Sequence, residues 1–128
     1  MIARDARAFG AERQQSVDAY IQGGRVLVAE RAATVAGYAL GIAAHGTAYL
    51  GSASADDGEV LLALLATLAG ELAGPGVVVR LLVPATDRRL VDGIMQLGFR
   101  VFRACQYMVR GAGIAPPPSY VLMNGDMM

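Results

Sequence analysis

The segment from residue 47 to residue 84 limits the fold more than any other part of the sequence, because two strand-like runs in it flank one helix-like run. Residues 47–53 (TAYLGSA) and 77–83 (VVVRLLV) predict strands, and residues 59–73 (EVLLALLATLAGELA) predict a helix that is apolar on almost every side. A strand–helix–strand unit within one sheet forms a right-handed crossover between parallel strands. The apolar run at 77–83 further predicts a central strand that is covered on both faces.

The flanking segments predict helices and short antiparallel strands. Residues 1–22 predict a helix with Gly10 as its point of interruption, and residues 87–98 predict a helix that begins at Asp87. Further strands are predicted at residues 25–31, 35–43, 101–110 and 120–124. The expected fold class is therefore α/β (α+β): one domain over residues 1–128, with a mixed, largely antiparallel sheet, a central β-α-β crossover and helices on both faces.

Charge and composition argue against several classes of protein. The 11 basic and 11 acidic residues balance, which gives no electrostatic argument for binding nucleic acid or an anionic membrane. Cys105 is the single cysteine, so no internal disulfide and no thiolate zinc site is supported. The longest apolar run, at residues 60–69, is far shorter than the ~20 residues of a membrane-spanning helix. We therefore expect a cytoplasmic protein without a bound metal, whose 55% of hydrophobic residues leave apolar surface for a partner.

Two ordered stretches carry a resemblance to a known family. The second strand of the predicted hairpin reads VAGYALG (residues 35–41), and the strand, loop and helix at residues 77–100 end in Leu-Gly-Phe. In this order they resemble the GNAT superfamily of acyl-CoA-dependent N-acyltransferases. FGAERQQSV, AYLGSASA, MVRG and YVLMNG also resemble the divergent C-terminal GNAT-like domain of tandem GNAT acetyltransferases. The resemblance implies acetyl-CoA as co-substrate, a small amine as acceptor, and docking to a preceding GNAT domain or to a second copy as a homodimer.

The expected phosphate loop departs from the family pattern, which is Gln or Arg, two residues, Gly, one residue, then Gly or Ala. The stretch at this place, SASADDGE (residues 52–59), has one glycine, no basic residue and three carboxylates. Carboxylates repel a pyrophosphate that would otherwise bind at a helix N-terminus. Asp56 and Glu59 have the spacing of a capping box, so we interpret them as caps of the helix that begins there.

The expected proton donor is also missing from its usual place. GNAT enzymes commonly carry a tyrosine four residues before the glycine of Gly-Phe, and Ile94 stands there in this sequence. Tyr107 is a weak candidate for the catalytic acid, because a packed core tyrosine is the simpler interpretation. We expect His45 to be exposed in a turn and Cys105 to be a small buried side chain in a strand.

Any ligand is expected where the strands at residues 47–53 and 77–83 part, since crevices in such sheets lie beyond the strand carboxyl ends. The residues expected to border it are Leu50, Gly51, Ser52, Ala53, Val83, Pro84 and Asp87. Two functions remain open at this point. One is an N-acetyltransferase domain, expected as a divergent half of a tandem enzyme, and the other is a non-catalytic GNAT-like domain for substrate contact or dimerisation.

Overall fold

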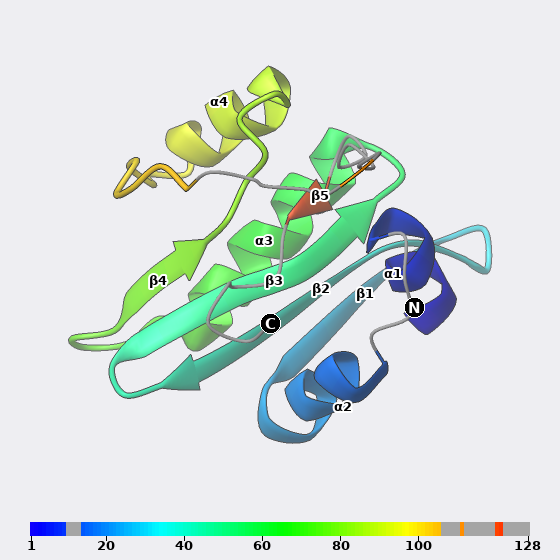
Figure 1. The fold of residues 1–128 in the computed structure, drawn as a ribbon, viewed down its shortest axis with the longest axis horizontal. Helices are drawn as coiled ribbons and strands as arrows, with labels where there is room; N and C mark the ends of the chain where they lie inside the picture. The colour runs from blue at the N-terminus through cyan, green and yellow to red at the C-terminus, as the bar shows by residue number, and fades with distance from the viewer. Residues whose placement is uncertain (10–13, 106–110, 112–119, 122–128) are drawn as a thin grey trace.

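A computed structural model gives the fold of the chain (Figure 1) and describes residues 1–9, 14–105, 111 and 120–121. The predicted N-terminal helix is divided in two, with residues 10–13 outside the described part. In chain order the elements are α1 (Ile2–Phe9), α2 (Gln14–Gly23), β1 (Arg25–Arg31), β2 (Thr34–Ala44), β3 (Thr47–Ala55), α3 (Gly58–Leu72), β4 (Val78–Leu81), α4 (Arg88–Gln96) and β5 (Tyr120–Val121).

The strands form one mixed sheet in the order β1-β2-β3-β4, with β5 also paired to β3. β1 with β2 and β2 with β3 are antiparallel, whereas β3 and β4 are parallel and are joined through α3. The predicted fold class, with its central crossover, is therefore confirmed. The short turns between β1, β2 and β3 leave no alternative to antiparallel pairing, because parallel strands need a long connection.

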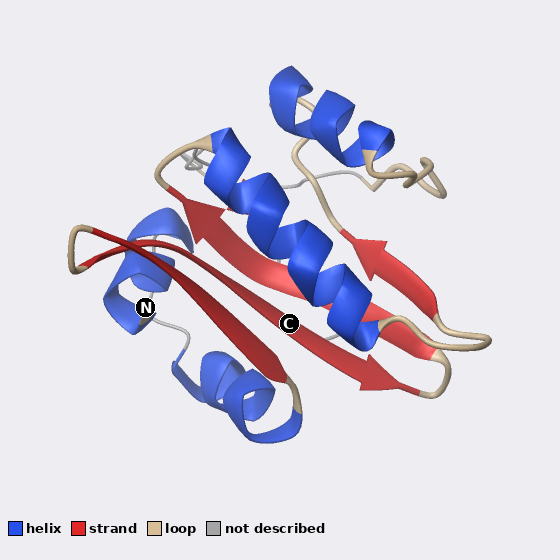
Figure 2. Ribbon diagram, turned by 180° about the vertical axis from the view of Figure 1, so that it is seen from behind, coloured by secondary structure: helices blue, strands red, loops and turns tan. Residues whose placement is uncertain are grey.

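Helices cover both faces of the sheet. α3 crosses one face with α4 beside it, and α1 and α2 lie on the opposite face (Figure 2). The larger core lies under α3, whose buried side chains are Leu61, Leu64, Leu65 and Leu68. A smaller core of Val17, Tyr20, Tyr38 and Leu40 lies under α2. The apolar character of α3 on nearly all sides is explained by its contacts with the sheet on one side and with α4 on another.

Gly37, the first of the two glycines of the VAGYALG stretch, allows α3 to approach the sheet closely. A Cβ atom at this position would lie 2.8 Å from the Cβ of Ala55 and 3.0 Å from Cδ1 of Leu64. Real side chains do not tolerate such contacts without movement of the neighbours. The close packing of α3 on β2 therefore explains why a glycine stands at position 37.

Two predictions about the C-terminal half of the sheet are wrong. β4 is shorter than residues 77–83 and is not covered on both faces, since Val78 is 53% exposed and Arg80 is exposed. Among the described residues it forms the end of the strand order. Residues 101–105 form no strand, and Val101 and Phe102 are each 75% exposed. The rest of the strand predicted at 101–110 lies outside the described residues.

Candidate functional site

β3 changes its pairing partner at the place where the sequence predicts a crevice. It pairs with β4 only as far as Leu50, which lies opposite Leu81. On its other edge Leu50 faces Gly41, whereas Ala53 faces Ala39, so β3 has one residue more than β2 between these pairs. Such a bulge bends a strand and changes the direction of its remaining residues. β3 and β4 therefore part immediately after Leu50.

Gly51 allows the backbone to adopt the conformation of this bulge. Its φ is +135°, a conformation that residues with a side chain rarely adopt. The neighbouring residues Leu50, Ser52 and Ala53 are all buried, with relative exposures of 0–1%. The border of the predicted crevice that β3 contributes is thus a packed part of the core.

β5 lies along the edge of β3 that β4 has left. Val121 pairs with Ala53, and Tyr120 pairs with Ser54, in antiparallel orientation. Val121 is fully buried and belongs to the same core as Leu50 and Ala53. The chain's own backbone therefore runs where a ligand beside Ala53 would have to lie.

The other residues predicted to border the crevice do not form a ligand-binding site beside Ala53. Val83 and Pro84 are half-buried and lie directly after β4. Asp87 is the N-cap of α4, and its Oδ1 accepts a hydrogen bond from the amide of Leu90 at 3.1 Å. A carboxylate in this position satisfies an amide that the helix itself cannot bond.

Asp57, rather than Asp56, caps α3. Its Oδ1 accepts a hydrogen bond from the amide of Val60 at 2.9 Å, and the amide of Glu59 also bonds to this carboxyl group. The bond from Val60 and, more weakly, the charge of Arg31 hold the pKa of Asp57 below its ordinary value, against the opposing effect of desolvation. The cap is therefore an anion at neutral pH.

The predicted capping box of Asp56 and Glu59 is wrong by one residue, because β3 runs further than expected. The amide of Asp56 donates to the carbonyl of Ala36 at 2.8 Å, which keeps Asp56 attached to the sheet, and the helix begins at Gly58. The side chain of Asp56 pairs instead with Arg4, at 2.7 Å between Oδ1 and NH2.

The loop before α3 does not fit a CoA pyrophosphate. Two of the amides at the helix N-terminus are bonded to Asp57, whose Oδ2 lies 3.3 Å from NH2 of Arg31. Together the carboxylate and the arginine occupy the helix end as a bound anion and its counter-ion would. Glu59 adds a third acidic group that is exposed to solvent.

Neither of the two positions considered for the catalytic acid gives a proton donor among the described residues. Ile94 is 5% exposed and packs in the core under α3, and Tyr107 lies outside the described part of the chain. His45 is exposed in the β2–β3 turn with φ of +51°, as expected. Cys105 is exposed, so the prediction of a buried cysteine is wrong, because residues 101–105 do not join the sheet.

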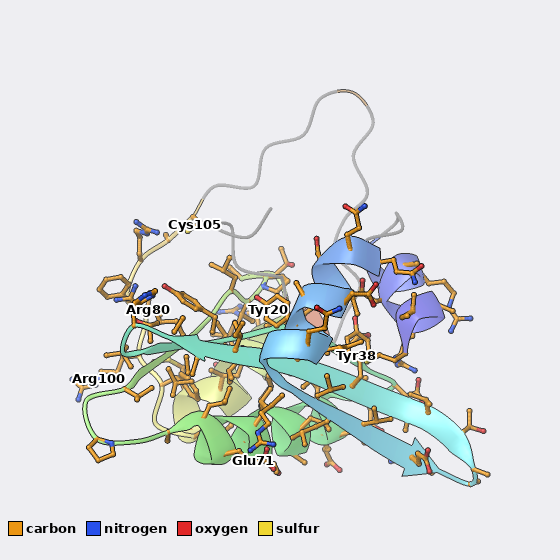
Figure 3. The ribbon with its side chains drawn as sticks, turned by 90° about the horizontal axis from the view of Figure 1, so that it is seen from below. Tyr20, Tyr38, Glu71, Arg80, Arg100 and Cys105 are labelled. Carbon is orange, nitrogen blue, oxygen red and sulfur yellow. The ribbon has the colours of Figure 1, made fainter. Side chains whose placement is uncertain are left out.

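A buried polar cluster of Asp5, Tyr38 and Ser52 was not predicted from the sequence. The Tyr38 hydroxyl and the Ser52 hydroxyl donate to Oδ1 of Asp5 at 2.5 and 2.7 Å, and the two hydroxyl oxygens lie 3.2 Å apart. Tyr38 lies on the face of the sheet that α1 and α2 cover (Figure 3). With relative exposures of 0–1%, the three side chains anchor α1 to β2 and to the bulge of β3 and are closed to solvent.

No group of three or more His, Cys, Asp or Glu side chains that could hold a metal ion occurs in the described part of the chain. Of the helices whose residues are described, none has the length and apolar character needed to cross a membrane.

Comparison with known proteins agrees with this architecture. A family model described as "Acetyltransferase (GNAT) domain" matches residues 1–122. A solved structure of a point mutant of TTHA1254 from Thermus thermophilus is similar, with a TM-score of 0.64 and 21% sequence identity over 85% of this chain and 88% of that chain. At this identity the likeness concerns the fold alone. No curated protein matches the sequence.

Proposed function

Since the chain belongs to the GNAT acetyltransferase family, we propose that it is a non-catalytic GNAT domain of an acetyl-CoA-dependent N-acetyltransferase. A separate and catalytically complete GNAT domain transfers the acetyl group to the amine. The present domain docks on that partner, either as the second half of a tandem arrangement or between copies, and contributes contacts to the acceptor substrate.

The N-terminus of α3 carries this proposal. A pyrophosphate binds to a helix N-terminus because the first amides are unbonded and the helix dipole is positive there. In this chain Asp57 already accepts from two of those amides. Two like charges ~4 Å apart repel by about 1 kcal/mol in bulk water and by several times that near a protein surface. A bound pyrophosphate would meet that repulsion from Asp56, Asp57 and Glu59.

Two further observations support the non-catalytic assignment. The backbone of β5 pairs with Ala53 and Ser54, on the edge of β3 that faces the departing β4. Ile94 is packed in the core and cannot give a proton to a leaving thiolate. Phosphate anchoring, access to the crevice and acid catalysis are therefore impaired at three independent positions.

One observation favours a second candidate, in which this chain transfers the acyl group itself. β3 and β4 part at the bulge after Leu50, which is the kind of opening in which α/β sheets bind ligands. For this candidate to hold, β5 must leave Ala53 and Ser54 during turnover, and CoA must bind without the helix N-terminus.

Release of CoA thiol from acetyl-CoA, measured for the full chain with a panel of primary amines, separates the two candidates. The non-catalytic domain gives no release above the rate without protein, both for the wild type and for Val121→Gly, which loosens β5. Saturable turnover by either protein, lost on substitution of a half-buried residue at the border of the crevice, such as Val83→Trp in that background, would overturn the proposal and favour the second candidate.

A further inference from the structure

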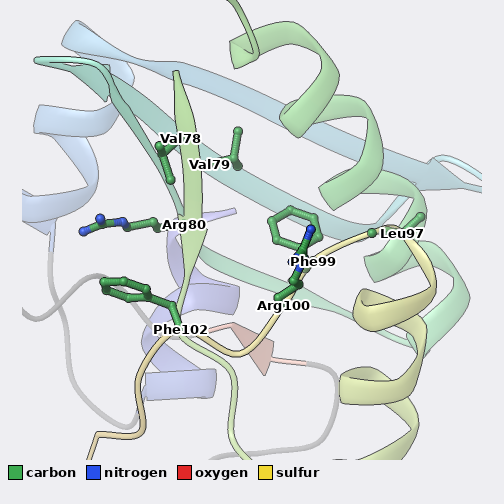
Figure 4. A pocket seen from close by; sticks show the side chains of 8 residues that line it. Val78, Val79, Arg80, Leu97, Phe99, Arg100 and Phe102 are labelled. Atoms are coloured by element: carbon green, nitrogen blue, oxygen red, sulfur yellow. The ribbon is translucent and has the colours of Figure 1, made fainter. Parts of the chain in front are cut away.

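A groove lies between β4 and the chain that follows α4 (Figure 4), and its lining shares no residue with the crevice described above. Its volume is about 580 Å³, within the range of clefts that bind ligands. The residues of its lining that matter here are Val78, Arg80, Leu97, Arg100 and Phe102. Arg80 and Arg100 lie at the end of the molecule away from Tyr38 (Figure 3).

The groove is positively charged although the whole chain has no net charge. Among the described residues its lining contains Arg80 and Arg100 and no carboxylate. Within the described part of the chain, neither arginine forms an ion pair, since the pairs there join Arg4 to Asp56 and Arg31 to Asp57. Two arginines without acidic partners create a local potential that attracts carboxylates, and the planar guanidinium suits paired hydrogen bonds to them.

Apolar surface borders the two charges. Phe102 is 75% exposed, Val78 53% and Leu97 44%. The guanidinium of Arg80 lies 4.7 Å from the centre of the Phe102 ring, a distance at which the cation is attracted to the ring face. Exposed aromatic residues beside arginines are typical of the positions that dominate binding between proteins.

The groove also presents a strand edge. Among the described residues, β4 pairs with β3 and with no other strand. The amide of Val78 donates toward β3, to the carbonyl of Gly46 at 2.9 Å. Because successive residues of a strand direct their backbone groups to opposite edges, the amide and carbonyl of Val79 face the groove. An extended chain could therefore add beside β4 through backbone hydrogen bonds.

We propose that this groove binds an acidic peptide segment in extended conformation. The segment adds as a strand beside β4, places carboxylates on Arg80 and Arg100, and lays apolar side chains against the exposed surfaces of Val78 and Phe102. The charge of the lining selects acidic over basic segments, and the strand edge selects a peptide over a compact anion. This proposal names the partner for the docking role given above and rests on it, but its test needs no acetyl-CoA.

Fluorescence anisotropy of the full chain with a short fluorescein-labelled peptide, in which pairs of glutamates alternate with pairs of valines so that each face of the strand carries both, tests the proposal. Saturable binding is expected, and Arg100→Glu weakens it by about tenfold or more, which corresponds to the loss of one strong charge contact. The matched control is Arg89→Glu, the same charge reversal at an exposed arginine of α4 outside the groove lining, and it leaves the affinity near that of the wild type. The same peptide with lysine in place of each glutamate binds far more weakly.

Equal effects of Arg100→Glu and Arg89→Glu would overturn the proposal, as would equal binding of the two peptides or no saturable binding to the wild type. Both substitutions are at exposed side chains, and thermal melts verify that the variants remain folded. Absence of peptide binding together with absence of acetyl transfer would leave the non-catalytic assignment in place and reject only the acidic partner. Acetyl transfer together with peptide binding would reject the non-catalytic assignment alone.

Discussion

The hydroxyl of Tyr38 donates a hydrogen bond to Oδ1 of Asp5 at 2.5 Å, which ties the first helix of the chain to the second strand. Ser52 donates to the same oxygen from the bulge of β3. A buried carboxyl group is costly unless polar partners satisfy it, so these two hydroxyls stabilise the packing of α1 on the sheet. The cluster therefore fixes the conformation of β3 at the point where a GNAT crevice would open.

Tyr38→Phe should destabilise the fold by about 1–3 kcal/mol, because it removes a donor from a buried carboxylate that remains in place. Urea denaturation with a fluorescence or circular dichroism signal measures the change in the free energy of unfolding. Tyr49→Phe is the matched control, since Tyr49 is only half-buried, and its effect should stay within about 0.5 kcal/mol. Similar effects of the two substitutions would contradict the role of the cluster.

The stability supplied by the charge of Asp57 should depend on pH. Its pKa is lowered in the folded state, so the ionised cap stabilises the fold above the ordinary value of 3.8, and this contribution is lost as the pH falls through the lower pKa of the folded state. We expect the wild type to be more stable than Asp57→Asn at neutral pH and the difference to shrink at pH values below 3.8. A difference in the free energy of unfolding that is the same at neutral and strongly acidic pH would contradict this.

Glycine-to-alanine substitutions should have opposite effects at two positions. Gly37→Ala places a Cβ atom 2.8 Å from Ala55 and should cost about 1–3 kcal/mol, as overpacking of a tight interface does. Gly70 lies in α3 with no heavy atom within 4 Å of a Cβ, and Gly70→Ala should stabilise the helix by about 0.5–1 kcal/mol. Thermal melts of both variants measure the signs, and stabilisation by Gly37→Ala would show that α3 does not pack as described.

Restoring a tyrosine at the place of the usual acid should not restore acetyl transfer. Ile94→Tyr introduces a larger and polar side chain into the core under α3, so it should destabilise the fold by about 1–3 kcal/mol. Ile94→Val, which keeps the core apolar, should cost about 0.5–1.5 kcal/mol. If Ile94→Tyr released CoA thiol faster than the reaction without protein, the lack of the acid alone would account for the absence of acetyl transfer.

The apolar pattern predicted most of the fold, because it depends on local periodicity. The length of α3 and the crossover from β3 to β4 could be derived from runs such as residues 59–73. The three carboxylates of SASADDGE (residues 52–59) also predicted that this loop would bind a phosphate group poorly. Whether Asp56 or Asp57 caps the helix could not be predicted, since it depends on a hydrogen bond between Asp56 and Ala36 that joins separate strands.

Long-range contacts explain the features that the sequence could not predict. The pairing of β5 with Ala53 and Ser54 involves two residues that are far along the chain from β3, and no local pattern selects that edge. Asp5 has the pattern of a surface residue in a polar helix, and only the packing of α1 on the sheet makes it buried. The exposure of Cys105 likewise results from a strand that does not form over residues 101–105.

Isothermal titration of acetyl-CoA into the full chain tests the central claim most directly, since it needs no knowledge of the amine. With the amides of α3 bonded to Asp57 and with β5 on the edge of β3, we expect only heats of dilution, which means a dissociation constant weaker than ~1 mM. Saturable heat that fits one site at micromolar acetyl-CoA, and that Gly58→Asp at the start of α3 abolishes, would contradict the account.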